Sequence, residues 1–341
     1  EFNCENGKFT YYNQVVEDHK KYDQLTLPQI IKYSSNIGII KIAEELGSKT
    51  IHKYARLFGF GSVTNIDING ETSGSLKSHK DWSMISVGQI SMGHEVAVST
   101  IQLASAFSAI ANDGYLIRPY VVEQIVGNNN EIKKIVKPRF KRQIASQNVM
   151  KKIKGMLRKV VISGTGNEAD IAGWEIAGKT GTAQKYIDGK YSDEKFISNF
   201  VGFFPESEPQ ILSAIILDEP DSPMHWGGQG AAVAFKRIIE RIINMDDKIM
   251  PPIKKENALA QNIKEIQPKF DHIKTPPRLN TTGVSQRIRV PDLKGKSLKK
   301  AMNIVSQFGL RIKINGSGRV ISQKPKPGTI LSPKDICYVE L

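Results

Sequence analysis

The stretch that most constrains the fold is residues 177–183, which read Ala-Gly-Lys-Thr-Gly-Thr-Ala. It follows a short apolar run and precedes a polar segment, as a strand with one edge facing a ligand would. Its glycines allow another backbone or a substrate to approach closely. Lys179 supplies a positive charge, while Thr180 and Thr182 supply hydroxyls for a carboxylate or a developing oxyanion. We therefore predict a ligand-facing strand here.

The same stretch has a competing interpretation as a phosphate-binding loop. Residues 173–180 match the pattern G-x-x-x-x-G-K-[ST]. That loop must open directly into a helix, whose N-terminus and backbone N–H groups hold the phosphates. Here the intervening residues are bulky and strand-like, and residues 181–189 have no helical apolar period. The pattern favours the strand, and nucleotide binding is the alternative. Taken alone, the stretch would be an ordinary strand that contains a lysine.

Composition indicates an ordinary soluble protein of two domains. The chain has 341 residues, of which 40% are hydrophobic and 24% charged. No apolar run is long enough to span a membrane, and no signal peptide begins at residue 1. The abrupt start at Glu1 leads us to expect a fragment. The two cysteines, Cys4 and Cys337, lie at opposite ends and form neither a metal-ligand spacing nor a disulfide framework.

Helical patterns dominate the first half of the chain. Caps and apolar periodicity predict a first helix that begins at Thr26-Leu27-Pro28, a second that runs from Ile37 and ends at Gly47, and a third capped by Ser48. Two more helices are predicted over residues 98–111 and 146–163. Residues 1–25 are polar and predict a loop, and residues 62–95 predict irregular structure. Residues 120–136 predict a hairpin with a turn at residues 127–129. The first domain therefore opens with a helical block.

The pattern changes after residue 170. Residues 175–184, 199–204 and 211–218 predict three consecutive strands, and residues 230–244 a closing helix. Together with the helical block they predict a mixed domain over residues 1–245. Residues 246–288 are rich in proline and lysine and predict a linker. Residues 289–341 form a small unit, with a helix at 297–308 and strands at 311–314, 320–323 and 336–340.

The net charge of +14 is concentrated at the C-terminal end. Residues 246–341 hold 19 Lys and Arg against 8 Asp and Glu. Such a tail suits an anionic surface: nucleic acid, anionic lipid or an acidic polymer. No aromatic-rich RNA motif or zinc finger accompanies it. A solvated face that keeps the domain soluble explains the charge equally well.

Three small polar residues, Ser34-Ser35-Asn36, separate two apolar helices. Simple helix capping explains them. Alternatively, the two packed helices hold these three side chains out into a cleft, where they can contact a ligand. Both interpretations stand on local sequence alone.

With Ser34-x-Asn36 and Lys179-Thr180-Gly181-Thr182 together, the chain resembles class B penicillin-binding proteins, the division-type serine D,D-transpeptidases that cross-link peptidoglycan. Further similar stretches are residues 33–38, 88–90, 102–104, 110–114 and 164–166, so the resemblance covers residues 13–244 nearly without break. Residues 290–295 and 325–329 resemble a PASTA domain, an extracytoplasmic module linked to cell-wall binding.

The resemblance implies an α+β fold like that of serine β-lactamases and transpeptidases, with a helical block and an antiparallel sheet, followed by a small α+β PASTA-like domain. It implies catalytic roles for three side chains. Ser34 passes a proton toward the leaving amine, Asn36 hydrogen-bonds a substrate amide, and Lys179 sets the field and orients Ser34.

The resemblance also implies a substrate-binding strand and a set of partners. Thr180, Gly181 and Thr182 bind substrate: the two hydroxyls hold its terminal carboxylate, and the Thr182 N–H forms half of the oxyanion hole. No metal or organic cofactor is called for. The implied partners are peptidoglycan stem peptides, β-lactams, a membrane-embedded glycosyltransferase and division proteins, and no nucleic acid. The implied location is the extracytoplasmic face of the bacterial cytoplasmic membrane, with an anchor upstream.

One element of the family pattern has no counterpart here. The family nucleophile is a serine in S-x-x-K upstream of S-x-N, and no such motif precedes Ser34. Residues 192–195 and 297–300 match S-x-x-K but stand in the wrong order and context. We therefore expect a chain that begins after the catalytic serine and is inactive alone. The alternative is a non-catalytic muropeptide- or wall-binding protein with the same fold.

Overall fold

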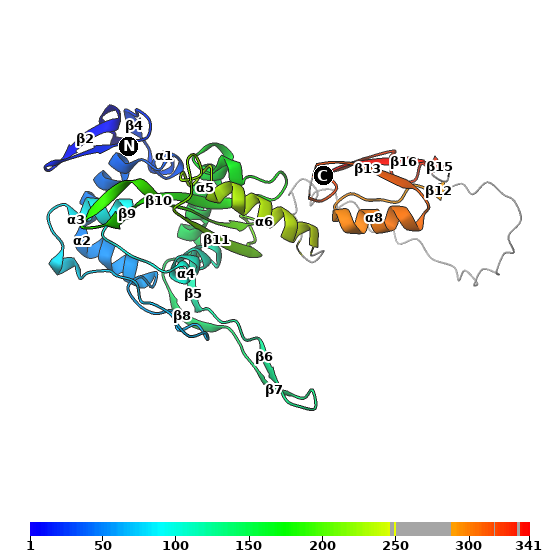
Figure 1. Cartoon of the computed structure of the whole chain (residues 1–341), viewed down its shortest axis with the longest axis horizontal. Coiled ribbons are helices and arrows are strands. Elements are labelled where there is room, and N and C mark those ends of the chain that lie inside the picture. The colour runs from blue at the N-terminus through cyan, green and yellow to red at the C-terminus, as the bar shows by residue number, and fades with distance from the viewer. Residues whose placement is uncertain (246–248, 250–287, 317, 333–334) are drawn as a thin grey trace, which may run out of the picture. The chain divides into compact units, whose positions relative to one another are not determined.

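The structure, a computed structural model, describes residues 1–245, 249, 288–316, 318–332 and 335–341 (Figure 1). The chain divides into two compact units, Glu1–Arg237 and Ile238–Leu341. The expected linker, residues 246–288, lies outside the described residues except for residues 249 and 288. Within the described part, no helix is both long and apolar enough to cross a membrane.

The N-terminal segment is not the loop that its polar composition predicts. It forms β1 (Phe2–Asn3), a short 3-10 turn (Glu5–Gly7), β2 (Lys8–Tyr11), β3 (Gln14–Glu17) and β4 (Gln24–Leu25). The strands β2 and β3 pair as a hairpin, and β1 pairs with β4. Four widely spaced apolar side chains give this segment its ordered structure. Cys4, Tyr11, Val16 and Leu25 are buried in one cluster with isoleucines of the two helices that follow.

Two helices follow, and their junction shapes the candidate site. Helix α1 (Leu27–Tyr33) begins at a capping box formed by Thr26 and Gln29. Helix α2 (Asn36–Leu57) begins at Ser35, whose side chain accepts a hydrogen bond from the Gly38 N–H. The backbone of α2 is non-helical at Gly47, with φ 75° and ψ 156°. The two helices expected on either side of this glycine therefore meet there at a kink.

The middle of the first unit contains one helix that the sequence pattern missed. Helix α3 (Ser86–Met92) lies in residues 62–95, which we expected to be irregular, after a short 3-10 turn (His79–Asp81). Its buried residues are Ser86, Gly88 and Gln89 instead of an apolar stripe, so it has no hydrophobic period to detect.

The remaining predicted elements of the helical block are confirmed with small shifts. Helix α4 (Thr100–Ala111) is capped by Ser99, and α5 (Gln147–Ser163) by Ser146. The predicted hairpin is β6 (Gln124–Val126) paired with β7 (Ile132–Ile135). A further pair, β5 (Tyr115–Arg118) with β8 (Arg139–Gln143), flanks it (Figure 1). A 3-10 turn (Asn167–Ala169) follows α5.

The predicted three-stranded meander is confirmed and longer than expected. Strands β9 (Ala177–Ile187), β10 (Lys190–Phe204) and β11 (Ile211–Asp218) are antiparallel in the order β11-β10-β9, so β9 lies at an edge. Leu157 of α5 packs with Ala177 and Phe203 of the sheet. Helix α6 (Ala231–Met245) follows, and its Phe235 ring packs edge-on against Phe200 with 4.8 Å between ring centroids. The fold is α+β, as predicted.

The second unit has its own small core around the helix expected at residues 297–308. It contains β12 (Ile288–Arg289), α8 (Leu298–Gln307), β13 (Arg311–Asn315), β14 (Ser322–Lys324), β15 (Ile330–Leu331) and β16 (Ile336–Glu340). Strand β16 is central, parallel to β13 and antiparallel to β14, and β12 pairs with β15. Strands β12 and β15 were not expected, because each has only two residues.

Candidate active site

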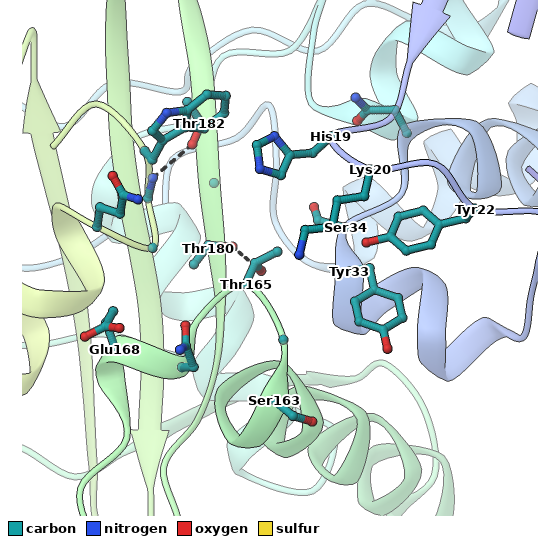
Figure 2. A pocket seen from close by; sticks show the side chains of 18 residues that line it. His19, Lys20, Tyr22, Tyr33, Ser34, Ser163, Thr165, Glu168, Thr180 and Thr182 are labelled. Atoms are coloured by element: carbon teal, nitrogen blue, oxygen red, sulfur yellow. Dashed lines mark hydrogen bonds between the residues drawn. The ribbon is translucent and has the colours of Figure 1, made fainter. Parts of the chain in front are cut away.

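A cleft of about 530 Å³ lies beside the edge strand β9 (Figure 2). Four other segments complete it: the turn after β3, the α1–α2 junction, the loop after α5 and the loop before α6. Polar groups and glycines dominate the lining: His19, Lys20, Tyr22, Tyr33, Ser34, Asn36, Ser163, Gly164, Thr165, Asn167, Glu168, Thr180, Gly181, Thr182, Trp226, Gly227, Gly228 and Gln229.

Ser34 reaches the cleft because it is the residue between two helices. It ends α1 in the left-handed conformation, with φ 56° and ψ 45°, and is exposed. Its backbone N–H donates to the Ile30 carbonyl, and the next residue, Ser35, already caps α2. Left-handed serine is disfavoured, so neighbouring contacts must hold it. Both interpretations of the tripeptide are therefore correct: Ser35 is the cap, and Ser34 projects into the cleft.

Lys179 joins the two predicted motifs. Its Nζ donates to Ser34 Oγ at 2.8 Å and to the Thr180 carbonyl oxygen at 2.9 Å. Lys179 is half-buried and does not itself line the cleft, but it bonds to the lining residue Ser34. Burial disfavours the charged ammonium and lowers the pKa of Lys179 to about 8. Near neutral pH this group is mostly a cation but can release its proton readily.

The hydroxyls of β9 are held by the loops on either side. The hydroxyls of Thr180 and Thr165 are 2.7 Å apart, and the Gly227 N–H donates to Thr182 Oγ1 at 3.0 Å. Because Thr182 Oγ1 accepts that bond, its own proton stays free for a ligand. A Cβ on Gly227 would collide with the Gly181 carbonyl, so this contact requires glycine.

Asn36 is the first residue of α2 and is half-buried. Its Nδ2 donates to the Glu17 carbonyl oxygen at 3.1 Å, which fixes the amide beside Ser34. The second N–H and the amide oxygen have no partner among the described residues. The structure thus brings together all six residues singled out from the sequence. Five line the cleft, and Lys179 contacts one of these five.

The phosphate-loop interpretation is wrong for this chain. Strand β9 continues through Lys179 to Ile187, where that motif needs the first turn of a helix. A strand presents no helix N-terminus to a phosphate group.

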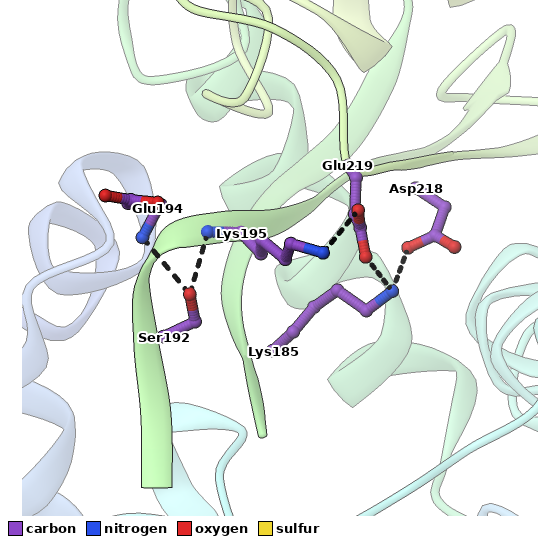
Figure 3. Close-up of polar contacts among 6 residues, drawn as sticks. All are labelled: Lys185, Ser192, Glu194, Lys195, Asp218 and Glu219. Carbon is purple, nitrogen blue, oxygen red and sulfur yellow. Dashed lines mark hydrogen bonds and ion pairs between the residues drawn. The ribbon is translucent and has the colours of Figure 1, made fainter. Parts of the chain in front are cut away.

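The S-x-x-K match at residues 192–195 lies within β10, and its serine and lysine side chains have different partners. Figure 3 shows that Ser192 Oγ accepts from the backbone N–H groups of Glu194 and Lys195, at 3.2 and 3.1 Å. Lys195 Nζ instead pairs with Glu219 at 3.3 Å. Lys185 bonds to the same carboxylate at 2.7 Å and to Asp218 at 2.9 Å.

The second match begins at Ser297, the buried N-cap of α8, whose Oγ accepts from the Lys300 N–H at 3.4 Å. It belongs to the other compact unit and serves its helix. Neither S-x-x-K match lines the cleft.

Several residues that line the cleft were not predicted from the sequence. Figure 2 shows His19 and Lys20 entering the cleft from the side of Ser34. The His19 ring lies 5.2 Å from that of Trp226. The glycines at 227, 228 and 230 are a local signal that could have marked the loop before α6 as part of the cleft. No local sequence signal marks His19 and Lys20 as lining residues, because their position at the cleft depends on how strand β3 pairs with β2.

Comparison with known proteins shows the family of this chain. Residues 1–240 match the family described as penicillin-binding protein transpeptidase domain, and residues 288–336 match the PASTA domain. The chain is similar to stage V sporulation protein D of Bacillus subtilis, with 30% identity over 310 residues. That match covers 89% of this chain and 44% of the relative.

A second relative is named probable peptidoglycan D,D-transpeptidase PbpC, from Pseudomonas aeruginosa. It is 33% identical over 235 residues, covering 68% of this chain and 40% of the relative. The chain thus spans about two fifths of the length of these relatives. Among solved structures, penicillin-binding protein 3 of Mycobacterium tuberculosis, complexed with aztreonam, superimposes with a TM-score of 0.65 at 25% identity, covering 72% of this chain and 57% of that chain.

Proposed function

Because this chain belongs to the penicillin-binding protein transpeptidase family and carries a PASTA domain, we propose that it is part of a class B peptidoglycan D,D-transpeptidase. Its cleft would bind a stem peptide that ends in D-Ala–D-Ala. The contact of 2.8 Å between Lys179 Nζ and Ser34 Oγ carries this proposal, because it joins two motifs 145 residues apart beside an edge strand.

The proposed chemistry is acyl transfer: a serine gives its proton to a base and attacks the penultimate D-Ala carbonyl, the C–N bond breaks, and the terminal D-Ala leaves as an amine. That amine must gain a proton as the bond breaks. Ser34 Oγ–H would donate this proton and take one back from the Lys179 ammonium. The existing hydrogen bond points in that direction, from Nζ to Oγ. A pKa near 8 makes Lys179 a ready proton donor at neutral pH.

The β9 edge would bind the peptide along its backbone, as an added strand does. The free proton of the Thr182 hydroxyl would hold the terminal carboxylate together with the Thr180 hydroxyl, which donates to it when Thr165 is the donor in their mutual bond, and the Lys179 charge lies nearby. Asn36 would contact a substrate amide. The Thr182 N–H would form half of the oxyanion hole, and Gly181 would let the peptide approach the strand closely.

The serine that becomes acylated is, in our proposal, not among these 341 residues. Neither S-x-x-K match in the chain lies at the cleft. Intact-mass measurement after incubation with penicillin should therefore show no covalent adduct on this polypeptide. A stable adduct on Ser34, Ser192 or any other serine would disprove this part of the proposal.

The proposed setting is the extracytoplasmic face of the bacterial cytoplasmic membrane, where stem peptides are cross-linked. Stem peptides and β-lactams would be ligands, and a glycosyltransferase and division proteins would be partners. We propose domain limits of 1–245, 246–288 and 289–341. The division between compact units, between Arg237 and Ile238, falls eight residues earlier, inside α6.

A calorimetric titration tests binding at the cleft. An N-acylated peptide ending in D-Ala–D-Ala should bind, and its diastereomer ending in L-Ala–L-Ala should not. Thr182→Val removes the hydroxyl with little change of shape and should weaken binding about tenfold, as expected for a lost charge-assisted hydrogen bond. Thr10→Val, an exposed threonine on β2, is the matched control. Equal affinity for both diastereomers would contradict the proposal.

A further inference from the structure

The turn after β3 places a carboxylate under the junction of α1 and α2. Asp18 Oδ2 accepts from the Ser35 hydroxyl at 2.6 Å, and Asp18 Oδ1 accepts from the Ile37 N–H at 3.1 Å. We propose that Asp18 is a positioning residue that fixes Ser34 and Asn36 in the cleft. This inference rests on the proposed function, since it concerns the same site.

The first observation is the conformation of Ser34. With φ 56° it occupies a region that residues other than glycine, asparagine and aspartate seldom adopt. Such a residue keeps that conformation only when its surroundings hold it. On its N-terminal side it continues α1. On its C-terminal side it depends on Ser35, which is buried and whose N–H donates to the Ile30 carbonyl oxygen at 3.1 Å.

The second observation is how Asp18 holds Ser35. The Ser35 hydroxyl accepts from the Gly38 N–H at 2.9 Å, and its single proton lies between two acceptors, Asp18 Oδ2 at 2.6 Å and Cys4 Sγ at 3.6 Å, of which the nearer, charged carboxylate is the stronger. Asp18 therefore sets the direction of the hydroxyl, so that a lone pair faces the helix. The Ile37 N–H is one of the first-turn donors that α2 cannot satisfy itself. A carboxylate at a helix N-terminus is also favoured by the helix dipole. Asp18 thus caps α2 from a distant segment.

The third observation links the same turn to Asn36 and the cleft wall. The carbonyl of Glu17, one residue before Asp18, accepts from Asn36 Nδ2. The two residues after Asp18, His19 and Lys20, line the cleft. Because Asp18 anchors this turn to α2, its loss would release the Asn36 contact together with the Ser34 conformation.

A purely structural role predicts a different outcome. If Asp18 only stabilised α2, its replacement would lower stability without a specific effect on Ser34 or Asn36. A double-mutant design separates the two roles, since coupled residues give non-additive effects.

The test uses the full chain with Asp18→Ala and Asp18→Asn, and with Asp23→Asn as control. Asn keeps the shape of Asp18 and one acceptor, in case the alanine variant folds poorly. Asp23 is exposed in the same segment. The probe is the N-acylated D-Ala–D-Ala peptide, and urea unfolding is measured in parallel. We expect affinity to fall about tenfold in Asp18→Ala, less in Asp18→Asn, and not in the control.

The same changes in a Ser34→Ala, Asn36→Ala background should cause no further loss of affinity. An equal loss in both backgrounds, or no loss at all, would overturn the inference. If the unaltered chain does not bind the peptide, the proposed function fails separately. Crystal structures then decide: the distance from Ser34 Oγ to Lys179 Nζ should lengthen beyond hydrogen bonding in Asp18→Ala or Asp18→Asn. An unchanged 2.8 Å contact in both would overturn the positioning role.

Discussion

The lowered pKa of Lys179 predicts an unusual pH dependence for carboxylate binding. With a pKa of about 8, roughly nine tenths of the Lys179 side chains are charged at pH 7 and roughly one tenth at pH 9. A lysine with the usual pKa of about 10.4 would stay almost fully charged over this range. If the ammonium holds the terminal carboxylate, the affinity of a D-Ala–D-Ala peptide should fall about tenfold from pH 7 to pH 9.

Calorimetric titration at several pH values measures this directly. Lys179→Arg keeps a charge at every pH used, so its affinity should be nearly constant from pH 7 to pH 9. A peptide with a C-terminal amide should likewise lose the dependence, because it has no carboxylate to hold. A flat profile in the unaltered chain, or a decline centred near pH 10.4, would show that a Lys179 ammonium with a lowered pKa does not hold the carboxylate. A decline that persists in Lys179→Arg would assign the titration to another group.

Three further predictions concern the core, the cleft wall and the tail. Phe200 is fully buried against Phe235, so Phe200→Ala should cost about 3–5 kcal/mol in urea unfolding, whereas the exposed Phe140→Ala should change stability by less than about 0.5 kcal/mol. Gly227→Ala should weaken peptide binding several-fold, because its Cβ would collide with the β9 backbone; Gly155→Ala, with open space around it, should not. The basic segment 246–341, much of it outside the described residues, should bind isolated peptidoglycan more weakly as salt rises, since exposed charges are screened over about 8–10 Å; retention that is independent of salt would contradict this.

The residues singled out from the sequence do lie together at the cleft, whereas several other lining residues were not predicted. Ser34, Asn36 and the stretch 179–182 stand out because they interrupt apolar periodicity with small polar residues, glycines and a lysine. Local pattern also predicted the sheet, and with it the edge position of β9. The distance between Ser34 and Lys179 could not follow from local pattern, because it depends on how α1 packs against α5 and the sheet.

The missed elements share a physical cause. Residues 1–25 are ordered by four widely spaced apolar side chains, which no short window shows as a period. Helix α3 buries Ser86, Gly88 and Gln89, so its inner face is polar. Asp18 carries no motif of its own and acquires its contacts only when β3 brings it under α2. In each case tertiary contacts decide what local propensity leaves open.

A crystal structure of this chain with the N-acylated D-Ala–D-Ala peptide would show whether the cleft binds the peptide as proposed. The proposed function predicts that the peptide lies along β9, with its carboxylate between the hydroxyls of Thr180 and Thr182 and its last amide nitrogen near Ser34 Oγ. Density for the peptide outside this cleft, or in it with the carboxylate turned away from β9, would contradict the claim.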